Sequence, residues 1–295
     1  MKQSIHTNHK IASQNKEAKS CTACWALLRA WAHAMQAHSR HFASQNKEAK
    51  SSAPVRTVAF CFAKQGGFMS SLWTENIEMP EFPTLEKDIR TQVLIIGGGM
   101  AGILCAYFLQ QAGVDYCLLE KDRICQGVTG HTTAKITAQH GLIYEKSLQS
   151  LGQERAELFL KANLKAVENY KNLGRFLECD MEETDSYLYS VKERRKLESE
   201  IQALGSLGFQ ADYTEDTELP FEVEGAIRFP RQAQFQPLKF AAGISKNLRI
   251  YEHSEVREMT EYFALTEKGS VAAEKIIIAT HFPFINTRGS YYLKL

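Results

Sequence analysis

The sequence predicts an α/β fold built on a parallel sheet, and three consecutive features predict it. Residues 91–96 form a short apolar run rich in branched side chains, which is typical of a buried parallel strand. The turn Gly97–Gly102 follows directly, with the spacing G-x-G-x-x-G. The apolar residues 103–112 then predict a helix, and residues 115–119 predict a second strand that leads into Glu120. A strand, a glycine turn, a helix and a strand in this order indicate a dinucleotide-binding unit.

The glycines of this turn have separate physical roles. Gly97 permits the tight turn out of the strand. Gly99 has no Cβ, so a pyrophosphate can approach the backbone, and Gly102 lets the helix pack closely on the strand. Gly113 is expected to end the helix, because glycine tolerates the left-handed conformation that commonly follows a helix. The pattern therefore has a mechanical reason at each position, and a glycine-rich turn of an unrelated α/β protein is the weaker interpretation.

The phosphates and the ribose of a dinucleotide have predicted partners. The helix N-terminus offers N–H groups and the positive end of a dipole, so Met100 and Ala101 are counted as cofactor-binding residues. Glu120 lies 18 residues after Gly102, where a carboxylate can accept hydrogen bonds from both ribose hydroxyls. The neighbouring Lys121 is also counted among the cofactor-binding residues. Glu120 argues against NADP because its charge would repel a 2′-phosphate. The fingerprint alone fits FAD and NAD, so an NAD-dependent dehydrogenase stays open as an alternative.

The loop after the second strand separates these two cofactors. Residues 127–135 read G-V-T-G-H-T-T-A-K, and small or hydroxylated residues let backbone amides and hydroxyls approach a cofactor. The loop resembles the corresponding segment of D-amino-acid-oxidase-like and glycine-oxidase-like flavoenzymes. The resemblance implies that FAD is the cofactor and that the loop follows its ribityl chain and pyrophosphate. By resemblance, the further cofactor-binding residues are Gly130, His131, Thr132, Thr133, Ala134, Val256 and Ala279.

A longer match narrows the resemblance to one subgroup. Gly130–Lys135 read G-H-T-T-A-K and Thr137–Gly141 read T-A-Q-H-G, as in the gamma-glutamylputrescine-oxidase-like subgroup. Residues 279–283 read A-T-H-F-P, as in that subgroup, where the wider family usually has A-T-G. Many members of the subgroup carry a C-terminal Rieske iron–sulfur domain. The paired Cys-x-His and Cys-x-x-His motifs of that domain are absent from this sequence.

The resemblance covers residues 88–290 and implies a Rossmann-like FAD-binding domain with an inserted, incomplete mixed α+β substrate domain. Residues 91–179 form the first part of the FAD-binding domain, and residues 180–236 form part of the substrate domain. Residues 237–295 return to the FAD-binding domain, and residues 69–90 are an N-terminal extension. Compared with the family, we expect the chain to be C-terminally truncated and therefore to turn over amines poorly.

Hydrophobic periodicity predicts the later elements. Ala156, Leu160, Leu164 and Val167 form one apolar helical face, which is usually core. The further predicted helices span residues 152–176, 192–207 and 237–247. The further predicted strands span residues 187–189, 220–229, 233–235, 250–253 and 275–280.

The implied reaction is oxidation of a C–N bond in a small amine or amino acid by hydride transfer to flavin. No general base is strictly required if the substrate amine arrives neutral, so the catalytic residues are left unassigned. His131, Lys135 and His140 are candidates for functional residues near the flavin. The alternative interpretation is that they serve in ordinary packing or ion pairing. Arg231 is a candidate for binding a substrate carboxylate, because a guanidinium can bind a carboxylate bidentately. The alternative interpretation is a surface ion pair. A catalytically incomplete FAD-binding fragment or remnant is the alternative function.

Residues 1–68 differ from the rest of the chain. They carry a net charge of +8 against −7 for the remainder, and residues 12–20 repeat as residues 43–51. Translation from an upstream start with Met69 as the true initiator, a targeting peptide, and a binding tail are the competing interpretations. We expect this leader to be disordered or non-native and to be unnecessary for folding or FAD binding.

The cysteines predict neither disulfides nor a metal site. Seven cysteines without regular spacing indicate free thiols in a reducing compartment, so a cytoplasmic location is expected. Cys21, Cys24, His33 and His38 form C-x2-C-x8-H-x4-H, but structural zinc sites usually have a longer central gap. No apolar run approaches the roughly 20 residues that span a bilayer. We expect no nucleic-acid partner, and the oligomeric state is left open.

Overall fold

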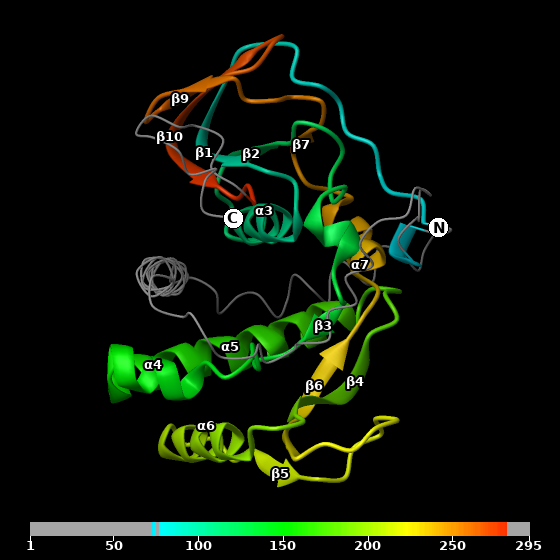
Figure 1. The fold of residues 1–295 in the computed structure, drawn as a ribbon. Helices are drawn as coiled ribbons and strands as arrows, with labels where there is room; N and C mark the ends of the chain where they lie inside the picture. The colour runs from blue at the N-terminus through cyan, green and yellow to red at the C-terminus, as the bar shows by residue number, and fades with distance from the viewer. Residues whose placement is uncertain (1–71, 75–76, 282–295) are drawn as a thin grey trace. The chain divides into compact units, whose positions relative to one another are not determined.

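The structure is a computed structural model that describes residues 72–74 and 77–281. Six of the strands form one sheet in the order β7-β2-β1-β10-β9-β8 (Figure 1). Neighbours among β7, β2, β1 and β10 are parallel, whereas β9 and β8 run antiparallel to the strand before them in that order. The strands are β1 (Ile89–Ile96), β2 (Tyr116–Leu119), β7 (Ile250–Tyr251), β8 (Glu258–Met259), β9 (Phe263–Leu265) and β10 (Ser270–Ile278).

The centre of this sheet is apolar on both faces, as a parallel sheet requires. Val93 and Ile95 of β1 pack toward the larger hydrophobic core, while Leu94 and Ile96 pack into a smaller core on the other face. Two helices, α3 (Met100–Gln111) and α7 (Pro237–Ser245), contact each other, and α3 also lies against β1 and β2 (Figure 1). The parallel sheet and its helices confirm the predicted α/β fold class.

A second sheet has the strand order β3-β6-β4, and β5 also pairs with β6. The strands β3, β4 and β5 each pair antiparallel with β6. In Figure 1 the long strands β6 and β4 run side by side, and helix α6 lies next to β5. The elements are β3 (Lys135–Ile136), β4 (Glu182–Ser190), β5 (Asp212–Thr214), β6 (Gly225–Gln234), α4 (Tyr144–Leu151), α5 (Gln153–Gly174) and α6 (Arg194–Ser206), with short 3-10 helices η2 (Leu72–Thr74) and η3 (Val128–His131).

Most predicted elements occur within a few residues of their expected bounds. The helix expected over 152–176 is α5, and its apolar face is core: Ala156, Leu160 and Val167 are buried. The helix predicted from 103 begins earlier, at Met100, and Gly113 lies just after its end with φ +69°. The strands predicted at 115–119, 187–189, 250–253 and 275–280 correspond to parts of β2, β4, β7 and β10.

Two predicted strands are wrong in their bounds. Residues 220–224 are not a strand, because β6 begins at Gly225. The separate strand expected at 233–235 is the end of the same β6, and a bulge opposite Thr184–Ser186 interrupts the pairing. Arg231 has φ +56° near this irregularity.

An aromatic cluster and a buried carboxylate join α4, α6 and β6. Phe229 stacks on Tyr144 at 6.3 Å and on Phe209 at 4.8 Å between ring centroids. Glu200 of α6 is only 1% exposed, and its carboxylate accepts the N–H of Tyr144 at 2.8 Å and of Glu145 at 2.9 Å. These N–H groups belong to the first turn of α4, where no intrahelical partner exists. Burial raises the pKa of Glu200, while these hydrogen bonds oppose the shift.

Replacing Glu200 should therefore destabilise the fold through α4. We expect Glu200→Ala to lower the free energy of unfolding by about 1–3 kcal/mol, because buried N–H groups lose their acceptor. The matched control is Glu198→Ala on the same helix, whose carboxylate forms an exposed pair with Arg194. Such a pair contributes about 0–1 kcal/mol. Urea denaturation of both variants is the measurement, and equal losses would show that the helix cap contributes nothing special.

Candidate functional site

The glycine turn brings the ends of β1 and β10 and the start of α3 into contact. Gly97 has φ +112°, and a Cβ built there would lie 2.8 Å from the carbonyl oxygen of Ala279. A Cβ at Gly102 would lie 1.9 Å from the carbonyl oxygen of Gly97. Gly97 is thus needed both for its conformation and for its contact with β10, and Gly102 for the packing of the helix on the turn.

The acidic residue at the end of β2 closes onto this turn. Glu120 Oε2 accepts the N–H of Gly98 at 2.6 Å, and Oε1 accepts the N–H of Asp122 at 3.1 Å. A Cβ at Gly98 would lie 2.9 Å from Glu120 Cβ, so only glycine allows this approach. Each carboxylate oxygen can accept more than one hydrogen bond, so capacity for ribose hydroxyls remains. Gly98 was not among the predicted cofactor-binding residues, although the run of three glycines could have pointed to it.

The space above Gly99 fits a phosphate group. Gly99 has φ −77°, which any residue adopts, and a Cβ there would meet only Thr129 Oγ1, at 3.5 Å. Neither the backbone conformation nor the packing of the protein therefore requires glycine at position 99. The N–H of Met100 donates to Thr129 Oγ1 at 3.1 Å, whereas the amide of Ala101 in the same first turn has no intrahelical partner. An open surface at a helix N-terminus suits an anion such as a pyrophosphate.

A cavity of about 340 Å³ begins at this helix start. Met100 and Thr129 line it, together with residues of β3, α5 and the segment 235–237. Its lining includes apolar side chains, among them Ile136, Val167, Tyr170 and Phe235. The polar side chains that line it are Thr129, Thr132, Lys135, Thr137, His140 and Asn163. Such a mixture of apolar side chains and a few polar groups is typical of cofactor and substrate pockets.

Lys135 and His140 are the two predicted catalytic candidates that reach the cavity. Desolvation lowers the pKa of His140, a hydrogen bond with Asn163 opposes the shift, and the charge of Lys135 adds to it. Asn163 Nδ2 donates to the carbonyl of Phe159 at 2.9 Å, which fixes the orientation of its amide. The imidazole of His140 and the side chain of Lys135 both line the cavity. Asn163 was not predicted, because it lies on a helix whose apolar stripe indicated only core packing.

The other two candidates lie elsewhere. His131 is exposed, and its Nδ1 lies 3.0 Å from the carbonyl oxygen of Gly127 in its own loop. Arg231 is also exposed, and its backbone N–H donates to Asp185 Oδ1 at 3.0 Å. Neither residue lines the cavity.

The remaining predicted cofactor residues surround the glycine turn and its loop. Thr132 accepts a hydrogen bond at its carbonyl from Trp73 Nε1 at 2.7 Å, which ties η2 to the loop. The N–H of Ala279 donates to the carbonyl of Ile96 at 2.8 Å. Gly130, Ala134 and Val256 are buried, whereas Thr133 and Lys121 are exposed. Their contacts with FAD remain predictions.

Within residues 72–74 and 77–281, no group of three metal-ligating side chains is suitably placed to hold a metal ion. In the same part of the chain, no helix has the length and apolarity that a membrane crossing needs. The residues of the possible zinc motif, Cys21, Cys24, His33 and His38, and the whole predicted leader lie outside the described residues.

Comparison with known proteins identifies the family. The FAD dependent oxidoreductase family, DAO, matches residues 92–290. The chain belongs to this family. FAD is therefore the cofactor, which confirms the sequence-based expectation, and the NAD-dependent alternative is not retained. The glycine turn, the acid at the end of β2 and the open surface over Gly99 fit this cofactor.

Two curated relatives extend the comparison. The Rieske 2Fe-2S iron-sulfur protein YhfW of Bacillus subtilis is 32% identical over 247 residues, covering 79% of this chain and 48% of that protein. Gamma-glutamylputrescine oxidoreductase of Escherichia coli is 23% identical over 220 residues, covering 67% of this chain and 50% of that protein. The chain thus spans about half the length of the curated relatives it matches.

Solved structures share the fold. L-proline dehydrogenase from P. horikoshii aligns with a TM-score of 0.52 and 18% identity, covering 68% of this chain and 54% of that one. L-amino acid deaminase from Proteus vulgaris aligns with a TM-score of 0.51 and 17% identity, covering 69% and 49% respectively. At this identity the likeness supports the arrangement of strands and helices alone.

Proposed function

We propose that this chain carries the FAD site of an oxidoreductase that removes hydride from a carbon beside nitrogen in an amine or amino acid. The observation that supports this most is that the glycine turn and the cavity share residues. Met100 and Thr129 hydrogen-bond each other at the start of α3, and both line the cavity. A cofactor with its pyrophosphate at the turn could thus extend directly into the pocket.

The residues of the chain have distinct roles in this proposal. Bound FAD would supply the hydride acceptor, and the protein would bind and orient it. Gly99 and the first turn of α3 would hold the pyrophosphate, and Glu120 would accept the ribose hydroxyls. Lys135 would place positive charge in the cavity. His140 would be able to form a hydrogen bond with the amine of a substrate, because it lines the cavity.

The substrate class follows from the relatives and the cavity. One relative is named a gamma-glutamylputrescine oxidoreductase, so we propose an aliphatic amine of this kind. The apolar side chains of the cavity suit a methylene chain, and its polar side chains suit an amine end. The four cysteines of the described residues are free thiols, which agrees with a reducing cytoplasm as the location.

The test is flavin bleaching in the absence of oxygen. We expect the purified chain to take up FAD and turn yellow, and gamma-glutamylputrescine to reduce the bound flavin. A yellow protein that no amine reduces would favour the alternative of a catalytically incomplete FAD-binding fragment or remnant. A chain that takes up no FAD would contradict the proposed site itself.

A further inference from the structure

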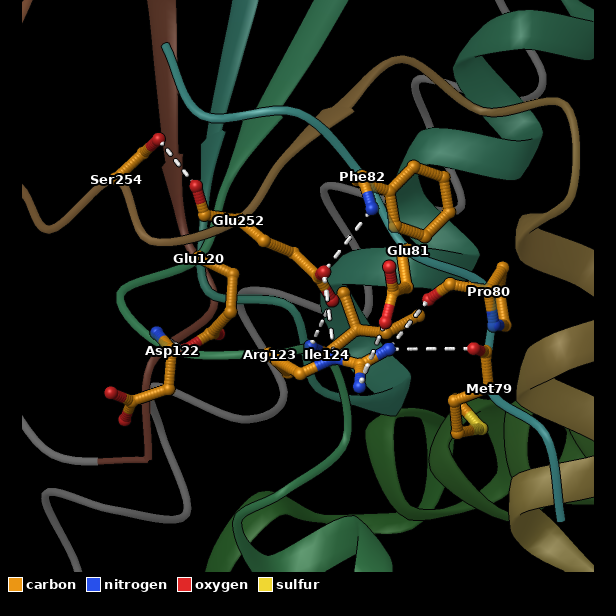
Figure 2. Close-up of polar contacts among 10 residues, drawn as sticks. All are labelled: Met79, Pro80, Glu81, Phe82, Glu120, Asp122, Arg123, Ile124, Glu252 and Ser254. Carbon is orange, nitrogen blue, oxygen red and sulfur yellow. Dashed lines mark hydrogen bonds and ion pairs between the residues drawn. The ribbon is translucent and has the colours of Figure 1, made fainter.

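Three segments that are far apart in the sequence meet behind Glu120, as Figure 2 shows. They are residues 79–85, residues 120–124 and residues 252–254. The family match begins at residue 92, so the first segment lies outside it. Backbone hydrogen bonds join the segments: Glu252 N–H donates to the carbonyl of Pro83 at 3.1 Å, and Ser254 N–H to that of Glu120 at 2.8 Å.

The side chain of Glu252 lies at the centre of this junction. It is 1% exposed. Its Oε1 accepts the N–H of Ile124 at 2.8 Å, and its Oε2 accepts the N–H of Phe82 at 3.2 Å (Figure 2). Arg123 Nε lies 3.8 Å from Oε2 and provides a compensating positive charge. One buried carboxylate therefore holds both the segment before β1 and the turn after β2.

Arg123 and Ser254 fasten the same segment at two further points. Arg123 Nη2 donates to the carbonyls of Met79 and Pro80, at 3.4 Å each. Ser254 Oγ accepts the N–H of Leu85 at 2.9 Å and donates to the carbonyl of Glu252 at 2.8 Å. Residues 79–85 are thus held along their length as a clasp over the end of β2 and the residues that follow β7.

A short chain of contacts connects Glu252 to the glycine turn. Ile124, which Glu252 holds, precedes Cys125, and the N–H of Cys125 donates to the carbonyl of Gly98 at 3.0 Å. The N–H of Gly98 in turn donates to Glu120 Oε2 at 2.6 Å. Gly98 is therefore held on one side by the turn that Glu252 anchors and on the other by the acid expected to bind ribose.

We propose that Glu252 and the clasp formed by residues 79–85 position Glu120 and the glycine turn for the adenosine half of FAD. Glu252 is a positioning residue, because it acts through Ile124 and Gly98 and not by touching the cofactor. The segment 79–85, which precedes the family match, is then a working part of the nucleotide site. This proposal rests on the ribose role proposed for Glu120.

Glu252→Gln is the sharpest single change. The amide keeps the size of the side chain and one acceptor oxygen, but its NH2 group would face an N–H donor of Ile124 or Phe82. It also removes the charge that pairs with Arg123. The matched control is Glu255→Gln, the same change at an exposed carboxylate three residues away.

FAD and FMN distinguish positioning from general damage, since FMN lacks the adenosine half. Titration by flavin fluorescence should show FAD binding at least about tenfold weaker in Glu252→Gln, a change of about 1.4 kcal/mol, with FMN binding altered by less than about twofold. Glu255→Gln should bind both like the parent. Unchanged FAD affinity, or equal losses for FAD and FMN, would overturn the proposal.

A double variant tests the route through Glu120. Glu120→Ala should itself weaken FAD binding by about tenfold or more. Combined with Glu252→Gln, the losses should be less than additive, because both changes remove the same positioned ribose contact. Fully additive losses of FAD affinity would contradict the proposal that Glu252 acts through Glu120. If Glu252→Gln does not fold, Ser254→Ala, which removes the hydrogen bonds of the hydroxyl with the N–H of Leu85 and the carbonyl of Glu252, should show the same selective loss for FAD. Its absence would overturn the proposal.

The outcome is separable from that of the proposed reaction. Binding alone decides the role of Glu252, whereas flavin bleaching decides the chemistry. If FAD binding depends on Glu252 as expected but no amine reduces the bound flavin, the positioning role of Glu252 would be supported and the proposed reaction would be contradicted. Unchanged FAD binding in Glu120→Ala would instead remove the ribose role and with it this proposal.

Discussion

Gly102→Ala is expected to lower the free energy of unfolding by more than about 3 kcal/mol, beyond the usual cost of overpacking. The added methyl carbon would lie 1.9 Å from the carbonyl oxygen of Gly97, which is a rigid backbone atom. Helix α3 would have to move away from β1 or the turn would have to open. FAD binding should be lost as well, because the pyrophosphate site is the same turn.

The control for Gly102→Ala is Gly205→Ala in helix α6. A Cβ at Gly205 meets no other atom within 4 Å, so the added methyl group has room. Alanine is also the better helix former, by up to about 1 kcal/mol in a helix interior, and Gly205 lies in the last turn of α6. Chemical denaturation of the apoproteins should therefore show opposite signs for the two substitutions. A Gly102→Ala protein as stable as the parent would mean that the helix does not pack on the turn this closely.

The dinucleotide-binding unit was predictable because its signals are local. Branched residues, glycine spacing and the terminal acid all lie within Thr91–Glu120, and each has one mechanical reason. The structure places β1, the turn, α3 and β2 in this order, and Glu120 closes on Gly98. Short-range sequence spacing was sufficient here, because the chain connects these elements directly.

The contacts that support the site were not predictable in the same way. Glu252 lies 128 positions from Ile124 and 170 from Phe82, and nothing in the local sequence marks it as buried. Glu200 likewise caps a helix that begins 56 positions earlier. A glutamate in a charged segment is usually solvated. Only the tertiary arrangement shows that these carboxylates accept backbone N–H groups from other segments.

The cavity shows an intermediate case. Of the residues of the loop 127–135 named from the sequence, Thr132 and Lys135 line the pocket and Thr133 does not, whereas Thr129, which was not named, does. His131, in the middle of the same loop, does not, because η3 turns its ring back toward Gly127. A loop motif can therefore identify a site without assigning the direction of each side chain.

Gly99→Val should separate cofactor binding from folding. Gly99 has no left-handed backbone, and a Cβ there would meet only Thr129 Oγ1 at an ordinary contact distance of 3.5 Å. Valine is a poor residue at a helix N-cap, so the apoprotein should lose about 1 kcal/mol of stability. FAD binding should fall by far more than about tenfold, or 1.4 kcal/mol, because the branched side chain fills the space of the pyrophosphate.

Gly99→Ala should fall between the parent and Gly99→Val in FAD affinity, since its single methyl group occupies less of that space. Thermal midpoints must be measured without FAD, because a bound ligand raises the apparent stability of any variant that still binds it. Flavin fluorescence titration then gives the affinities separately. FAD binding at parental affinity in Gly99→Val would place the pyrophosphate away from this turn, since a valine side chain and a phosphate cannot share the open surface over Gly99.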